Sequence, residues 1–339
     1  MIVAIGHIVQ HGPFGGGNRF VVSLADALEI AGHTVRFDLN SDDIDLILMT
    51  DPRSRSPNVS FTGAAILRYL AQRNPRALVV HRINECDERK GTKWMNWRLR
   101  TANYAADATV FIASWLRELD VWRDESESTV ILNGADTNIF HANGHVPWDG
   151  KEPMRFVTHH WGGNRMKGFD VYERLDAMMS ESQWLGKLDF TYIGNLPDGA
   201  AFQNATHIPP LDGPELGAEL RRHHAYVTAS VNEPAGMHHI EGALSGLPLL
   251  YRNSGALPEY CEGFGVPFEP ETFETALDKF HTGFLRFAGK LPQYDNTAEK
   301  MCAGYISFFE DLVARRDKIG ERRRLWRNPL TFIINQLPV

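Results

Sequence analysis

The chain has 339 residues, of which 43% are hydrophobic and 23% charged, a composition typical of a globular protein with two domains of about 150 residues each. Its net charge of −7 at pH 7 argues against nucleic acid as the main partner, because binding to phosphates requires a basic excess. Three scattered cysteines, Cys86, Cys261 and Cys302, exclude a disulfide framework and a cysteine metal cluster, and they indicate a reducing compartment. No run reaches the roughly 20 apolar residues of a membrane-spanning helix, and residues 1–7 resemble a strand instead of a signal peptide, so we expect a cytoplasmic protein.

The first half begins with a strand, a glycine-rich loop, a helix and a second strand. Residues 2–9 form the first apolar run, residues 20–31 carry apolar side chains at helical spacing, and residues 34–39 form the next run. Another strand and helix are predicted over residues 45–50 and 61–72. Such an alternation favours an α/β fold, with a parallel sheet and helices on its faces.

The glycine loop, which contains Gly15, Gly16 and Gly17, has three interpretations. It can be a plain tight turn, since glycine serves turns generally. It can also belong to a dinucleotide-binding site with Asp38 holding a ribose, although Phe20 occupies the third glycine position of the Gly-x-Gly-x-x-Gly fingerprint. The third interpretation comes from a family resemblance given below.

Polar residues lie at the end of the strand predicted over residues 77–84. His81, Asn84 and Asp87 lie where open α/β sheets bind ligands, at the carboxyl end of a parallel strand. We therefore predict ligand contacts for these three residues. A buried structural role stays open for His81, because a lone histidine commonly has one.

A change in composition marks the boundary between two domains. A strand is predicted over residues 108–113, Ser114 is a natural N-cap for a following helix, and another strand is predicted over residues 129–132. Residues 142–153 are rich in Gly, Pro, Asn and His and have no apolar period, as expected of a linker. The first domain is therefore predicted over residues 1–141.

The second half repeats the alternation of strands and helices and ends in a basic tail. We predict a second domain over residues 154–312 and a helical tail over residues 313–339. Seven basic residues and two acidic residues lie between Arg315 and Arg327. Such a segment can be a solvated face, or it can rest on an anionic membrane with the help of Trp326. The predicted strands of this half cover residues 154–158, 188–194, 225–230 and 247–251.

Charged residues and glycines follow two of these strands. Lys167 comes after the first strand, Glu233 lies in the loop after the strand over 225–230, and Glu241 lies a little over two turns into the next helix. The backbone N–H groups of Gly236 and Met237 are predicted at the start of that helix, where unsatisfied donors and the helix dipole favour an anion such as phosphate. An ordinary surface position is the alternative for each charged residue.

Three short sequences in this half resemble the donor-site signature of glycosyltransferase family 4, retaining enzymes of the GT-B architecture. They are Glu-Pro-Ala-Gly at 233–236, Glu-Gly-Ala-Leu-Ser-Gly-Leu-Pro at 241–248 and Ser-Gly-Ala-Leu-Pro-Glu at 254–259. The resemblance covers residues 1–268 and implies two Rossmann-like βαβ domains facing a cleft, with the C-terminal tail crossing back to the first domain. Many family members have Gly-Arg-x-x-x-x-Lys-Gly after the first strand of the second domain. Lys167 and Gly168 fit that pattern, but Gly162 stands at the arginine position.

The resemblance implies the transfer of a sugar from a nucleotide-diphosphate sugar to an acceptor hydroxyl with retention of configuration. Glu233 would hold the sugar hydroxyls, Lys167 the diphosphate and Glu241 the ribose. No covalent nucleophile is assigned, and the departing phosphate oxygen would take the proton of the acceptor. The implied catalytic residues are Glu233, Lys167 and His81; the implied donor-binding residues are Gly16, Gly17, Arg165, Lys167, Gly236, Met237 and Glu241; the acceptor candidates are Asn84 and Asp87.

No Asp-x-Asp motif accompanies a donor loop, so we expect neither a metal nor another cofactor. The implied acceptor is a bacterial surface glycan, a glycolipid or another hydroxyl compound, with peripheral contact between the basic tail and the inner membrane face. Two alternatives remain, an NAD-dependent Rossmann oxidoreductase and a non-catalytic protein that binds sugar nucleotides. The nucleotide base, the sugar, the acceptor, the oligomeric state and the roles of His238 and His239 stay open.

Overall fold

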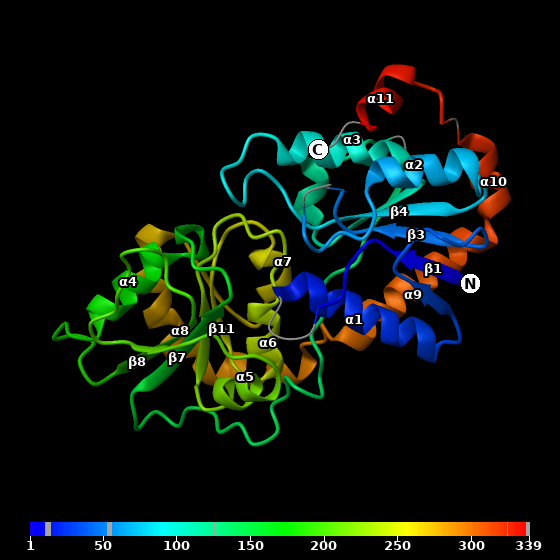
Figure 1. The fold of residues 1–339 in the computed structure, drawn as a ribbon. Helices are drawn as coiled ribbons and strands as arrows, with labels where there is room; N and C mark the ends of the chain where they lie inside the picture. Colours follow the sequence, from blue (N-terminus) through cyan, green and yellow to red (C-terminus); the bar gives the residue numbers. More distant parts are fainter. Residues whose placement is uncertain (11–14, 53–55, 125, 324, 337–339) are drawn as a thin grey trace. The chain divides into compact units, whose positions relative to one another are not determined.

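The computed structural model describes residues 1–10, 15–52, 56–124, 126–323 and 325–336 (Figure 1). The chain divides into two compact units. The first unit contains Met1–Leu132 and Glu299–Val339, and the second contains Asn133–Ala298. Each unit is built on one six-stranded sheet, and every strand pair in both sheets is parallel. The α/β fold predicted from the sequence is confirmed in both halves.

The first sheet has the strand order β2-β1-β3-β4-β5-β6. Its central strands β3, β4 and β5 are buried along their whole length, as expected of parallel strands covered on both faces. The first strand ends at Ile5, earlier than predicted, and residues 11–14 of the glycine loop lie outside the described residues. The strands are β1 (Ile2–Ile5), β2 (Thr34–Arg36), β3 (Leu46–Met49), β4 (Leu78–Ile83), β5 (Ala108–Phe111) and β6 (Glu127–Val130).

Helices cover both faces of the first sheet (Figure 1). On one face, Phe20 of α1 and Tyr305 of α9 belong to one buried cluster with alternate strand residues. On the other face, Leu67 of α2 and Tyr104 belong to a second cluster. The predicted helix after Ser114 is a short 3-10 helix, η2 (Ser114–Glu118). The helices of this unit are α1 (Gly15–Ile30), α2 (Gly63–Gln72), α3 (Met95–Ala102), α9 (Ala298–Ala314), α10 (Arg316–Arg322) and α11 (Pro329–Ile334).

The C-terminal segment belongs to the first unit from Glu299 onward. The sequence predicted that the second domain extends to residue 312, but α9 buries its apolar face against the first sheet instead. Arginines fix the rest of the tail: Arg316 pairs with Asp45, and Arg323 pairs with Asp107. The side chains of Arg323 and Asp107 are both less than one-tenth exposed.

The second sheet has the strand order β12-β11-β10-β7-β8-β9. Strands β7 and β10 are therefore neighbours in the sheet, although 64 residues separate the end of β7 at His160 from the start of β10 at Ala225. The strands are β7 (Met154–His160), β8 (Leu188–Gly194), β9 (Thr206–Ile208), β10 (Ala225–Thr228), β11 (Leu249–Arg252) and β12 (Gly265–Phe268).

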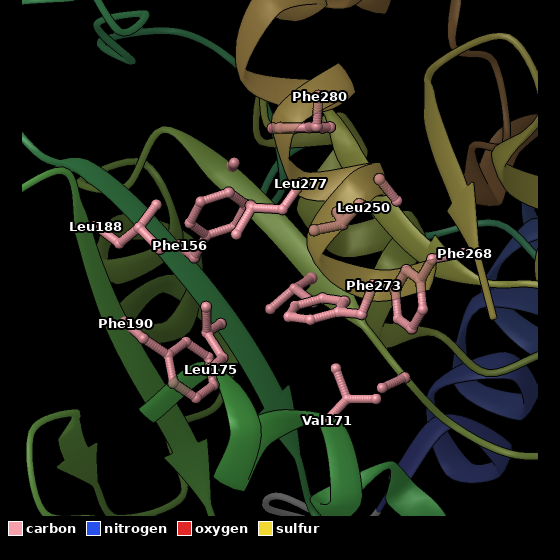
Figure 2. Close-up of a cluster of buried hydrophobic side chains, with 14 of the residues drawn as sticks. Phe156, Val171, Leu175, Leu188, Phe190, Leu250, Phe268, Phe273, Leu277 and Phe280 are labelled. Carbon is pink, nitrogen blue, oxygen red and sulfur yellow. The ribbon is translucent and has the colours of Figure 1, made fainter. Parts of the chain in front are cut away.

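The side chains of β7 and β10 alternate between the two faces of the second sheet. Phe156 of β7 and Val227 of β10 belong to the buried cluster on the face covered by α4 and α8. Figure 2 shows Phe273, Leu277 and Phe280 of α8 in this cluster. The helices of this unit are α4 (Phe169–Met178), α5 (Gly213–Leu220), α6 (His238–Leu244), α7 (Leu257–Cys261) and α8 (Phe273–Ala288).

Candidate functional site

The candidate site lies at the carboxyl ends of β7 and β10 in the second unit. Strand β7 ends at His160 and is followed by the 3-10 helix η3 (Arg165–Lys167), and the loop after β10 contains Glu233. Because the two strands are parallel neighbours, their carboxyl ends meet at the same edge of the sheet. Polar side chains from both connections gather at this edge.

Lys167 and Glu233 form a buried ion pair. The Lys167 Nζ donates to the Glu233 Oε2 at 2.6 Å, and the two residues are only 9% and 3% exposed. The sequence predicted separate ligands for them, the diphosphate for Lys167 and the sugar for Glu233. In the structure each charge offsets the desolvation of the other, so the two residues form one buried pair of opposite charges.

Backbone geometry at two glycines holds this pair in place. Gly168 has φ +96°, and a Cβ there would lie 2.3 Å from the Ala229 Cβ, so η3 can approach the end of β10 only with glycine at this position. Gly255 has φ +57°, and a Cβ there would lie 2.6 Å from the backbone of Glu233. The N–H of Ala256 donates to the Glu233 carbonyl at 2.9 Å. The Ser-Gly-Ala part of the motif therefore supports the backbone of the glutamate.

Glu241 receives a hydrogen bond from a histidine that the sequence analysis did not single out. The His159 Nε2 lies 2.6 Å from the Glu241 Oε2, and both residues are less than one-tenth exposed. The other ring nitrogen of His159 lies 3.1 Å from the hydroxyl of Tyr226. In the sequence, His159 follows one predicted strand and Tyr226 lies in another, and nothing shows that the two strands are neighbours. Only the strand order of the folded sheet brings the two side chains together.

Three more histidines are buried beside these carboxylates. The rings of His160 and His238 lie 4.6 Å apart between centroids, and the His238 Nε2 lies 2.7 Å from the Thr228 Oγ1. Burial lowers the pKa of His160 and His238 well below the usual value, and neighbouring cationic or histidine side chains lower it further. Burial also lowers the pKa of His239 to about 4. These three rings are therefore neutral at pH 7.

The remaining predicted donor residues lie around this centre with different exposure. Helix α6 begins at His238, so Gly236 and Met237 lie in the preceding loop, with Met237 as the N-cap and Gly236 at φ +74°. Arg165 is largely exposed and donates to Glu173 of α4 at 3.1 Å. An anion at the two backbone N–H groups and a phosphate contact of Arg165 stay predictions.

His81 is directed away from solvent in the first unit. It is fully buried, its Nδ1 lies 3.1 Å from the Asn103 Nδ2, and burial lowers its pKa to about 3. In this conformation its surroundings are those of a structural histidine, the alternative that the sequence left open. The sugar contact of His81 stays a prediction that requires its ring to reach the surface.

The other predicted residues of the first unit lie at the start of α3, after β4 and in α1. Asp87 accepts hydrogen bonds from the N–H groups of Met95 and Asn96, and it therefore caps the start of α3. Asn84 is half-buried, and Gly16 and Gly17 lie in the first turn of α1. The contacts predicted for these residues with acceptor and donor stay predictions.

Comparisons of structure connect this geometry to known proteins. No family model matches the sequence, and no curated protein is significantly similar to it in sequence. A glycosyltransferase from Rickettsia africae superposes with a TM-score of 0.64 at 12% identity, over 92% of this chain and 98% of the other. Sucrose-phosphate synthase from Thermosynechococcus elongatus gives a TM-score of 0.63 at 14% identity, over 92% and 99%. The chain has the GT-B fold.

HepE from Anabaena, in complex with UDP and glucose, also shares this fold. It superposes with a TM-score of 0.60 at 13% identity, over 91% of this chain and 99% of HepE. The predicted architecture of two Rossmann-like domains is thereby confirmed. Within the described part of the chain, no group of three or more His, Cys, Asp or Glu residues is arranged to hold a metal ion.

Proposed function

We propose that the protein is a retaining glycosyltransferase of family 4 type that transfers a sugar from a nucleotide-diphosphate sugar to an acceptor hydroxyl. The observation that carries this proposal is the pair of buried carboxylates, Glu233 and Glu241, each bonded to a basic side chain at the ligand-binding edge of a GT-B second domain. Buried carboxylates at such an edge are suited to accept hydrogen bonds from hydroxyl groups. The complex of HepE with UDP and glucose supports a donor of this class.

The proposed reaction needs positive charge where the leaving diphosphate develops. Lys167 supplies a buried ammonium, and the backbone N–H groups of Gly236 and Met237 supply oriented dipoles. When a donor binds, Lys167 is shared between the Glu233 carboxylate and the diphosphate, while Glu233 holds the sugar hydroxyls. The departing phosphate oxygen takes the proton of the acceptor on the same face, without a protein nucleophile, a metal or another cofactor.

Turnover and nucleotide binding test this proposal together. We expect one of a panel of UDP, GDP and ADP sugars to raise the melting temperature and to be hydrolysed or transferred, because a ligand that binds the native state stabilises it. Glu241→Ala should weaken nucleotide binding about tenfold or more, since it removes acceptors for the ribose hydroxyls. Glu271→Ala, at an exposed carboxylate of the same unit, is the matched control and should bind normally.

The alternatives predict different outcomes. Binding without turnover on any acceptor would favour a non-catalytic protein that binds sugar nucleotides. Fluorescence transfer to bound NADH would favour the oxidoreductase. No response to any nucleotide sugar, together with unchanged binding in Glu241→Ala, would overturn the proposal.

We also propose that the C-terminal segment contacts an anionic membrane at the inner face of a bacterial cell, where glycolipid or surface-glycan acceptors are made. Trp326, Leu330 and Ile333 are 63%, 68% and 58% exposed, whereas Phe332 packs into the first unit. No helix in the described ranges is long and apolar enough to span a bilayer, so the contact would be peripheral. Arg316 and Arg323 are paired with carboxylates, whereas Lys318 and Arg322 are exposed and would supply positive charge beside these apolar side chains.

Vesicle sedimentation tests the membrane contact. The protein should sediment with vesicles that contain phosphatidylglycerol and less with vesicles of phosphatidylcholine. Replacing Leu330 and Ile333 by serine should reduce sedimentation severalfold, because it removes exposed apolar area. Equal sedimentation of both forms would contradict this part of the proposal.

A further inference from the structure

We propose that His159 is the residue that positions the carboxylate of Glu241, so that recognition of a ribose by the second unit depends on one imidazole N–H. This inference rests on the proposed function, in which Glu241 accepts hydrogen bonds from a nucleoside diphosphate. It adds two residues, His159 and Tyr226, to those that the sequence identified.

The direction of the hydrogen bond follows from the chemistry of the two groups. An ionised carboxylate only accepts, so at 2.6 Å the His159 Nε2 must carry the proton and donate it to the Glu241 Oε2. Both partners are buried, Glu241 to 98% and His159 to 92%, and competition from bulk water is therefore weak. The contact restricts the rotation of the carboxylate.

Tyr226 determines which nitrogen of His159 carries the proton. The tyrosine hydroxyl accepts the backbone N–H of His159 at 3.0 Å, and its own proton is then directed to the His159 Nδ1 at 3.1 Å. The carbonyl oxygen of His159, at 3.5 Å, is the poorer acceptor. Burial raises the pKa of Tyr226 well above its usual value, so the hydroxyl keeps its proton. With its proton on Nε2, His159 satisfies all three groups.

The backbone places this chain of hydrogen bonds. Strands β7 and β10 are parallel neighbours, and Tyr226 pairs in register with Val157, two residues before His159. Helix α6 packs on the Tyr226 ring at Gly242, where a Cβ would lie 2.4 Å from the Tyr226 Cδ2. Tyr226 therefore fixes both the His159 imidazole and the distance between α6, which carries Glu241, and the sheet. Glycine is needed at position 242, directly after Glu241, because a larger residue would clash with the Tyr226 ring.

Two substitutions of His159 separate hydrogen bonding from packing. Glutamine can place an amide N–H near the position of the imidazole Nε2, whereas leucine fills a similar volume without a donor. His223→Leu, at another buried histidine of the second unit, is the matched control. The measurement is the ratio of dissociation constants for a nucleoside diphosphate and its 2′-deoxy and 3′-deoxy forms, determined by calorimetry.

We expect the wild-type protein to prefer the ribose form and His159→Leu to lower this preference about tenfold, since a hydrogen bond to a charged group orients the carboxylate. His159→Gln should keep the preference within about threefold of the wild type, and His223→Leu should leave it unchanged. A general loss of folding would instead lower the affinity for all nucleotides alike. Melting temperatures of the variants identify that case.

Tyr226→Phe provides a second variant if His159→Leu does not fold. It keeps the ring against α6 and removes only the hydroxyl, and it should lower the preference for ribose without abolishing nucleotide binding. An unchanged preference in His159→Leu, or in Tyr226→Phe when only that variant folds, overturns the positioning role alone. Equal losses in the glutamine and leucine variants overturn it as well. A wild-type protein that binds no nucleoside diphosphate overturns the proposed function together with this inference.

Discussion

Lys167 and Glu233 show how one buried pair can serve both stability and function. The two residues are 66 positions apart in sequence, and each residue as a whole is more than nine-tenths buried. A buried ion pair contributes little compared with an apolar pair of the same volume, but removing one partner leaves a buried charge. The pair is therefore more typical of a binding site than of a stabilising device, in agreement with the proposed role at the diphosphate.

Lys167→Met should lower the free energy of unfolding of the second unit by about 3–5 kcal/mol, because Glu233 then keeps a buried charge without its ammonium partner. Arg165→Met, at the exposed pair with Glu173 two positions earlier, should change it by less than about 1 kcal/mol. Urea unfolding at pH 7 measures both. Similar values for the two variants would show that the Lys167 pair is solvated.

The C-terminal segment is held on the first unit by the apolar face of α9 and by the side chain of Arg323. Helix α9 packs on one face of the first sheet, and α10 follows it. Arg323 is the C-cap residue directly after α10. Its Nε donates to the Asp107 Oδ1 at 2.8 Å, and its terminal nitrogens donate to the carbonyl groups of Pro75 and Ala77. The basic character that suggested a membrane surface is thus partly used inside the protein.

Arg323→Ala should destabilise the first unit by about 3 kcal/mol or more, because it leaves the buried Asp107 carboxylate without its guanidinium partner. Arg322→Ala removes the same charge from an exposed position one residue earlier, and its effect should stay within about 0.5 kcal/mol. Thermal and urea unfolding of the two variants provide the comparison. If Arg322→Ala is equally destabilising, net charge and not the buried pair holds the tail.

Histidines whose pKa is lowered by burial are distributed unevenly between the two units. Among the described residues, burial lowers the pKa of two histidines in the first unit, His7 and His81. In the second unit it does so for seven, namely His145, His160, His223, His224, His238, His239 and His281. The two units should therefore respond differently to acid.

We expect the second unit to lose stability first as the pH falls. A histidine whose pKa is lowered on folding binds its proton less strongly than the unfolded chain does, so its contribution to stability is complete above about pH 6.5 and is lost below it. For His239 and His224 this loss extends from pH 6.5 to about 4, at up to about 1.4 kcal/mol per pH unit for each group. Hydrogen exchange, corrected for its intrinsic pH dependence, measures the units separately. Equal loss of protection in both would contradict this expectation.

The sequence by itself determined the features that depend on neighbours along the chain. The alternation of apolar runs and helical spacing predicted two α/β halves, with Lys167 and Glu233 after strand ends and Glu241 in the helix that follows Glu233. Only the tertiary structure decided which of these side chains meet. The strand order places β10 beside β7, and this order brings His159 to Glu241 across 82 positions. The same holds for α9, whose apolar face suits either sheet by pattern alone but packs on the first. The spacing of apolar residues along a helix or strand indicates which of its faces is buried. Which element covers that face depends on the packing of the whole unit.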